Sequence, residues 1–144
     1  MTQEDKDLLL KDLACRLPYG VKAHIEHDTF YDEIEPYDGT VNTNTINDLL
    51  HNEKLEVRPY LRPVSSMTEE EMDRLFEILD IDKNGEDEDW IKINDCTGIK
   101  FLLPTGRWME EMDNALGYLR SIHIDIQGLI GKGLALEAPE GMYK

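Results

Sequence analysis

The chain has 144 residues, of which 31 are Asp or Glu and 15 are Lys or Arg, so its formal net charge is -16 at neutral pH. Such a charge repels nucleic-acid phosphates and anionic membranes, which argues against direct nucleic-acid or membrane binding and favours cationic partners or metal ions. Apolar residues make up 40% of the chain and recur at regular spacing from Leu8 to Leu136, which predicts a folded protein with one core or two small ones.

Two features indicate a cytoplasmic protein. Cys15 and Cys96 lie far apart without a partner spacing, as free thiols in a reducing compartment do. The polar start, Met1 to Asp7, lacks the pattern of a signal peptide, and no run approaches the ~20 apolar residues of a membrane-spanning helix.

The first half of the chain, residues 1–66, begins with a predicted helix. Thr2 and Asp5 have the spacing of a capping box, in which each side chain satisfies a backbone N–H at the helix start. Apolar residues from Leu10 to Leu17 give this helix one buried face, and Pro18 ends it.

A small antiparallel sheet, barrel-like in form, is predicted for the rest of this half. Residues 21–26 alternate between apolar and polar side chains, as a half-exposed strand does. Short strands and turns follow, and residues 45–50 have room for a single helical turn. Residues 55–57 return to the sheet, and we expect Pro59 and Pro63 to end that strand because proline lacks the N–H of the ladder.

The second half, residues 67–144, opens with a clear helix signal. Thr68 and Glu71 have the spacing of a capping box and precede apolar residues at helical spacing. Alternating apolar residues over 91–103 predict a β-hairpin, and residues 108–122 predict a long helix with an apolar face.

A short helix around Gln127 to Gly131 completes the predicted elements. Helix then strands, followed by helix, hairpin and helix, is the order of an α+β fold rather than of alternating parallel units. We expect residues 1–66 and 67–144 to form either two domains or one domain in two lobes.

Asp80, Asp82, Asn84 and Gly85 match the first half of an EF-hand calcium loop, where carboxylate and amide oxygens at alternate positions curl round the ion. The twelfth position, which should be a bidentate glutamate, is Ile91. The segment therefore gives two alternatives, a calcium-responsive loop and a solvated acidic turn. Calcium is the one cofactor that the sequence points to, and otherwise none is expected.

The histidines give one further candidate site. His24 and His27 fall on opposite faces of a predicted strand, which argues against a shared metal. His123 and Asp125 lie two residues apart after the long helix, where they would form a hydrogen-bonded pair in a small enzyme or metal site. In the other interpretation, Asp125 caps the next helix and His123 is a cation at the C-terminus of the previous one.

Catalysis is not expected, because no nucleophile in the sequence has a local base or a nucleophile-elbow context. A binding role is more plausible for the segment that contains Arg58, Tyr60 and Arg62. Arginine and tyrosine often anchor interfaces, and the two prolines beside them stiffen the chain before docking. The alternative is a connector whose tyrosine packs between the lobes and whose arginines pair with nearby acids.

Four stretches of the chain resemble a family of short uncharacterised proteins from Bacteroides-type gut bacteria and their phages and mobile elements. The resemblance lies in Leu17–Val21, Arg58–Glu71, Ile122–Ile130 and Lys132–Tyr143. It implies provenance and no activity, cofactor or catalytic residue.

The sequence therefore predicts a non-enzymatic protein–protein interaction module of phage or mobile-element origin. A special form of this prediction is a DNA mimic, whose acidic surface occupies a DNA-binding enzyme. The alternatives are the calcium-responsive module and the small enzyme or metal site at His123 and Asp125.

Overall fold

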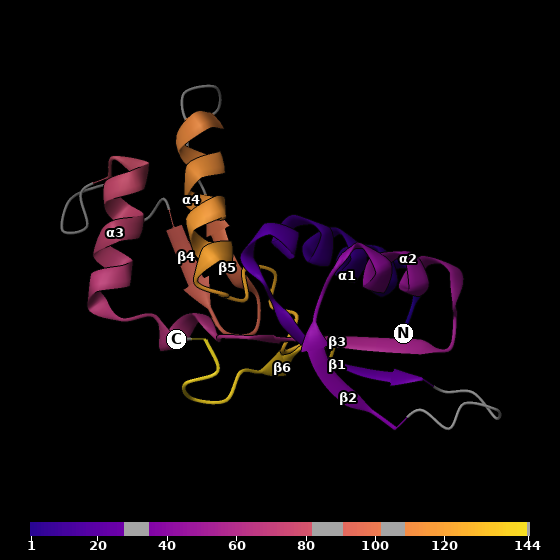
Figure 1. Cartoon of the computed structure of the whole chain (residues 1–144). Coiled ribbons are helices and arrows are strands. Elements are labelled where there is room, and N and C mark those ends of the chain that lie inside the picture. The colour runs from indigo at the N-terminus through magenta and orange to yellow at the C-terminus, as the bar shows by residue number, and fades with distance from the viewer. Residues whose placement is uncertain (28–34, 82–90, 102–108, 144) are drawn as a thin grey trace.

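The computed structural model describes residues 1–27, 35–81, 91–101 and 109–143 (Figure 1). These residues form a mixed α+β fold with four α-helices, a four-stranded sheet and a separate hairpin. In chain order the elements are α1 (Gln3–Arg16), β1 (Lys22–His27), β2 (Tyr37–Thr40), α2 (Thr43–His51), β3 (Leu55–Leu61), α3 (Glu69–Leu79), β4 (Ile91–Asn94), β5 (Gly98–Phe101), α4 (Met109–Ser121) and β6 (Leu136–Glu137).

The larger sheet is open, with the strand order β2-β1-β3-β6, so the barrel-like form predicted from the sequence is wrong. β1 pairs antiparallel with both β2 and β3, as expected. β6 joins β3 in parallel, which makes the sheet mixed rather than purely antiparallel. A two-residue strand paired with a segment so distant in the chain has no local signal in the sequence.

One face of this sheet carries the first core. Figure 1 shows α1 and α2 side by side over that face. Alternate residues of β3 are buried beneath them, since the strand has a strict alternation of buried and half-buried positions. Leucines from the helices, Leu9, Leu13 and Leu49, pack against apolar residues of the strands, among them Ala23, Ile25, Val57 and Leu61.

Two local predictions in this half need correction. β3 continues through Pro59 to Leu61 instead of ending there. At Pro59 the strand faces β1 alone, since β6 pairs only with Tyr60 and Leu61, and proline is tolerated where its missing N–H has no ladder partner. The single turn predicted at 45–50 is the nine-residue helix α2, which Asn42 and Thr45 begin with a capping box.

The second core lies between α3, α4 and the β4–β5 hairpin. Leu75, Leu79, Ala115 and Leu119 are fully buried there, together with half-buried neighbours on both helices. α3 begins at the predicted capping box of Thr68 and Glu71. α4 has thirteen residues and is followed by hydrogen-bonded turns, where a short helix was predicted at 127–131, and then by β6.

The chain after α4 connects the two cores. Ile124 and Ile126 belong to the second core, whereas Leu129, Leu134 and Ala135 belong to the first. Arg62 and Ile124 form a parallel bridge at the crossing, with Arg62 donating its N–H to His123 and accepting from Asp125. The division at residue 66 stays a prediction, and these contacts are among those that join the residues on its two sides. Within the described residues, no helix is long and apolar enough to cross a membrane.

Candidate functional site

The second face of the four-stranded sheet is polar, and it gathers several of the residues singled out in the sequence. Strand alternation places Glu56, Arg58 and Tyr60 of β3 opposite to the buried side chains of that strand. The same rule places His24 and Glu26 of β1 beside them. Among the described residues no helix covers this face (Figure 1). We call it the open face, defined by His24, Glu26, Asp38, Glu56, Arg58 and Tyr60.

His24 lies at the centre of the open face with both ring nitrogens on carboxylates. Nδ1 is 2.9 Å from Asp38 Oδ1 on β2, and Nε2 is 3.0 Å from Glu26 Oε1 on its own strand. Hydrogen bonds to Asp38 and Glu26 raise the pKa of His24, since both favour the protonated ring, although burial opposes the change. The same contact lowers the pKa of Asp38, to which Tyr60 also donates its hydroxyl at 3.0 Å.

Arg58 stands directly across from His24 in the β1–β3 pairing. Its Nε lies 3.3 Å from Glu56 Oε1 and its Nη2 lies 3.8 Å from Glu26 Oε1. These are ion pairs without hydrogen-bond alignment, and the buried Nε has no hydrogen-bond partner among the described residues. The two Nη groups also make no hydrogen bond to a described residue, and it is these groups, not the buried Nε, that another molecule can reach.

Arg62, unlike Arg58, has hydrogen-bond partners within the protein for its guanidinium. Its two Nη atoms bind both carboxylate oxygens of Glu71 at 2.7 and 2.8 Å, and they also donate to the carbonyl oxygens of Ser66 and Ile122. The hydrogen bond from Arg62 holds the pKa of the Glu71 carboxyl below its usual value. Of the three residues predicted to bind a partner, Arg58 and Tyr60 share the open face, whereas Arg62 joins β3 to the start of α3 and the end of α4.

His123 and Asp125 do not form the predicted pair. Asp125 is buried and accepts hydrogen bonds from the backbone N–H groups of Leu129 and Ile130, so it caps a turn. His123 has the left-handed backbone conformation, with φ 64°, and its ring stacks on Tyr143 with 3.5 Å between ring centroids. Burial, with Arg16 and Arg62 nearby, lowers the pKa of His123 to about 4, so the ring is neutral at pH 7 and is not the helix-end cation considered above.

A shallow cavity of about 450 Å³ lies beside the His123–Tyr143 stack, and Tyr19, Lys22, Arg62 and Ser121 contribute to its lining. Some of the polar groups around it are engaged, whereas His123 Nδ1 is buried without a hydrogen-bond partner among the described residues. The Tyr143 hydroxyl accepts from the Lys22 N–H and donates to the Tyr60 carbonyl oxygen, and the Ser121 hydroxyl donates to Tyr118. The Tyr143 hydroxyl therefore links the C-terminal segment to β1 and β3 beside this cavity.

The calcium prediction falls almost entirely on residues that the structure does not describe. Asp82 and Asn84 lie outside the described residues, and Asp80 is the left-handed residue that ends α3. Among the described residues, no group of three or more His, Cys, Asp or Glu side chains is arranged to hold a metal ion.

The sequence pattern predicted part of the open face. Alternation over residues 21–26 already marked His24 and Glu26 as the exposed side of a strand. The pattern does not give the register between strands. Only the β1–β2 and β1–β3 pairings place Asp38 and Arg58 on either side of His24. No known family model matches this chain, and comparisons with curated proteins and with solved structures gave no match.

Proposed function

We propose that this chain is a non-enzymatic protein–protein interaction module of phage or mobile-element origin that acts in the cytoplasm, and that its partner docks on the open face. The observation that carries the proposal is the state of Arg58. Its side chain is 30% exposed, and its two Nη groups make no hydrogen bond to a described residue, whereas Nε is buried. A carbonyl or carboxylate oxygen of the partner would accept hydrogen bonds from these Nη groups.

Tyr60 strengthens this proposal because it adds an aromatic surface next to Arg58. Its hydroxyl is fixed by Asp38, so little side-chain entropy remains to be lost when a partner packs against the ring. Arginine and tyrosine are enriched among the few residues that supply most of the binding energy of an interface. The centre of the interface is therefore proposed at these two residues, with the surrounding carboxylates as its polar rim.

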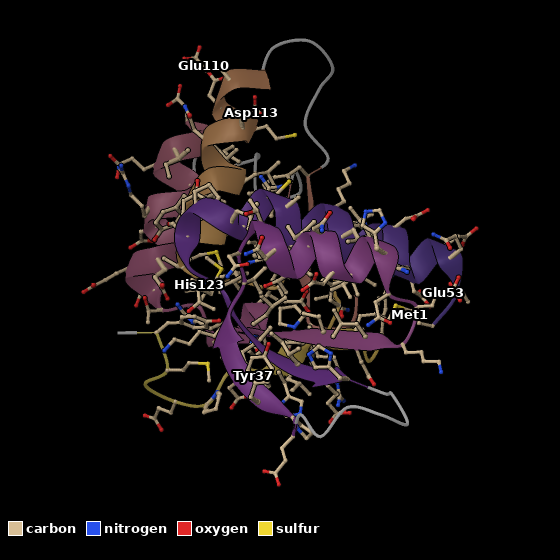
Figure 2. The ribbon with its side chains drawn as sticks, turned by 45° about the vertical axis from the view of Figure 1, so that its right-hand side comes forward. Met1, Tyr37, Glu53, Glu110, Asp113 and His123 are labelled. Carbon is tan, nitrogen blue, oxygen red and sulfur yellow. The ribbon has the colours of Figure 1, made fainter. Side chains whose placement is uncertain are left out.

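The net charge supports a second candidate, the DNA mimic. Exposed carboxylates at the start of α3 and α4, among them Glu69, Glu70 and Glu110, form acidic ends of the second lobe. Figure 2 shows Glu110 and Asp113 at one end of the molecule and Tyr37 of β2 near the opposite end. A mimic would bind a basic enzyme through the acidic ends, whereas the open face would stay free.

Capture from host lysate with matched variants separates the two candidates. The wild type, Arg58→Ala and Arg74→Ala are immobilised, and bound proteins are eluted in rising salt and identified by mass spectrometry. Arg74 is the control because it is an exposed arginine of α3 that pairs only with Glu77 among the described residues. We expect one stoichiometric partner that is retained by Arg74→Ala and weakened at least tenfold by Arg58→Ala, the loss expected for a central anchor of about 1.4 kcal/mol or more.

Equal retention of the partner by Arg58→Ala would contradict docking on the open face. If that partner is a DNA-binding protein released at modest salt and displaced by DNA, the mimic is supported instead, since phosphate-like contacts weaken steeply with screening.

A further inference from the structure

We propose that His24 is a pH-sensitive clasp that holds strand β2 onto the sheet and so keeps the open face intact. The clasp is a property of the free protein. Its effect on partner binding rests on the proposed function, because Asp38 of β2 and its neighbours form part of the proposed interface.

β2 is an edge strand with little support of its own. It has four residues, lies at one edge of the sheet and pairs with β1 alone among the described strands. None of its side chains is buried. Beyond the backbone ladder, its described side-chain hydrogen bonds are the two that Asp38 makes, with His24 of β1 and with Tyr60 of β3. The Tyr37 ring also stacks on His27 of β1, with 6.4 Å between the ring centroids. Because the Asp38 contacts are the described side-chain hydrogen bonds of this edge strand, their loss should weaken its attachment to the sheet.

Both hydrogen bonds of His24 can form only when the imidazole ring is protonated. The protonated ring donates from both nitrogens, one to Asp38 and one to Glu26, whereas the neutral ring has a single N–H. On loss of the proton, one carboxylate is left facing a nitrogen lone pair. The hydrogen bond to Glu26 lies within β1, so only the hydrogen bond to Asp38 joins two strands.

The charged and titratable groups around His24 come from all three strands. Glu26 and Lys22 lie on its own strand, Asp38 lies on β2, and Arg58, Glu56 and Tyr60 lie on β3. The carboxylates of Asp38 and Glu26 are within hydrogen-bond distance of the ring, while Arg58 is drawn toward Glu26 and Glu56. The closest groups thus favour the protonated ring.

The direction of the pH dependence follows from the two partners. His24 has a raised pKa, so its contribution is complete below about pH 6.5 and is lost as the pH rises through its folded pKa. Asp38 has a lowered pKa, so its contribution is complete above about pH 4 and is lost as the pH falls through its folded pKa. We expect the clasp to be strongest between these limits.

The test uses the free protein and needs no partner. NMR follows the titration of the His24 ring, and hydrogen exchange with mass spectrometry gives the protection factors of β2 relative to β3 from pH 6 to 9. We expect the relative protection of β2 to fall by about tenfold for each pH unit that separates the pKa of His24 in the docked and undocked states. Asp38→Asn should lower the pKa of His24 and remove this fall.

Asp113→Asn is the matched control, because Asp113 is an exposed aspartate on α4, at the opposite end of the molecule from Tyr37 of β2 (Figure 2), and should leave both measurements unchanged. A flat ratio of β2 to β3 protection in the wild type would overturn the clasp, and so would an equal fall in Asp38→Asn. Since no partner takes part, failure of the clasp and failure of the proposed function are distinguishable.

Discussion

Arg16 is a fully buried cation at the C-terminal end of α1. Its Nε and Nη2 bind the two carboxylate oxygens of Asp12 at 2.7 and 3.2 Å, and Nη2 also donates to the carbonyl oxygen of Ile124. Pairs four residues apart share a helix face, so α1 carries its own counter-ion into the core. Arg16 thus ties the first helix to the segment that follows α4.

Asp12→Ala tests how much the protein depends on that pairing. It leaves the Arg16 charge buried without its partner, which typically costs about 3–5 kcal/mol in the free energy of unfolding. Urea denaturation measures the change, and Glu77→Ala is the control because it breaks the exposed Arg74–Glu77 pair, worth about 1 kcal/mol or less. Equal effects of the two substitutions would show that Arg16 is not the buried charge described above.

His123 should make the protein sensitive to acid. Because its pKa is lowered to about 4 in the folded protein, the unfolded chain takes up the proton first as the pH falls below about 6.5. The free energy of unfolding should therefore decrease between pH 6.5 and 4, by up to about 3 kcal/mol from this residue.

His123→Asn isolates that contribution, since asparagine tolerates the left-handed conformation. The difference in unfolding free energy between wild type and variant should shrink as the pH falls. A difference that stays constant from pH 7 to 4 would mean that the His123 ring is not buried in its neutral form.

At the scale of the element, helix starts were readable from the sequence because their chemistry is local. Thr2 and Thr68 both form the predicted capping boxes. α2 was underestimated because its first turn is a polar run without apolar periodicity, although Asn42 and Thr45 carried a capping signal. Strand pairing could not be predicted in the same way, because it depends on the register between distant segments. This is true of the parallel strand β6, of the continuation of β3 through Pro59 and of the cluster around His24.

The β4–β5 hairpin docks on the turn after α4 through a close backbone approach at Gly98. A Cβ at this position would lie 1.9 Å from the carbonyl oxygen of Ile126, which accepts the Ile99 N–H. Gly133 has a similar positive φ but open space around it, so it is a matched control. We expect Gly133→Ala to cost roughly 1–2 kcal/mol for its backbone conformation alone, and Gly98→Ala clearly more.

Thermal or urea unfolding of the two alanine variants measures the difference. If both lose the same stability, the hairpin does not pack against Ile126 as closely as described.

At the scale of the whole molecule, the charge of -16 should oppose folding through self-repulsion. Screening shortens the range of that repulsion from about 30 Å at 0.01 M salt to about 3 Å at 1 M. The melting temperature measured by calorimetry should therefore rise by several degrees between 20 mM and 500 mM NaCl. Salt also weakens attractive ion pairs on the surface, which acts in the opposite direction. A falling melting temperature would show that ion pairs such as those of the open face outweigh the repulsion.

The central claim is the location of the partner on the open face. Carboxyl footprinting by mass spectrometry measures it directly, since the labelled acids differ between the candidate surfaces. In the complex, we expect protection of Glu26, Asp38 and Glu56, with Glu110 and Asp113 labelled as in the free protein. Protection of Glu110 and Asp113 with unchanged labelling of the open face would contradict the account and place the partner on the acidic end of α4.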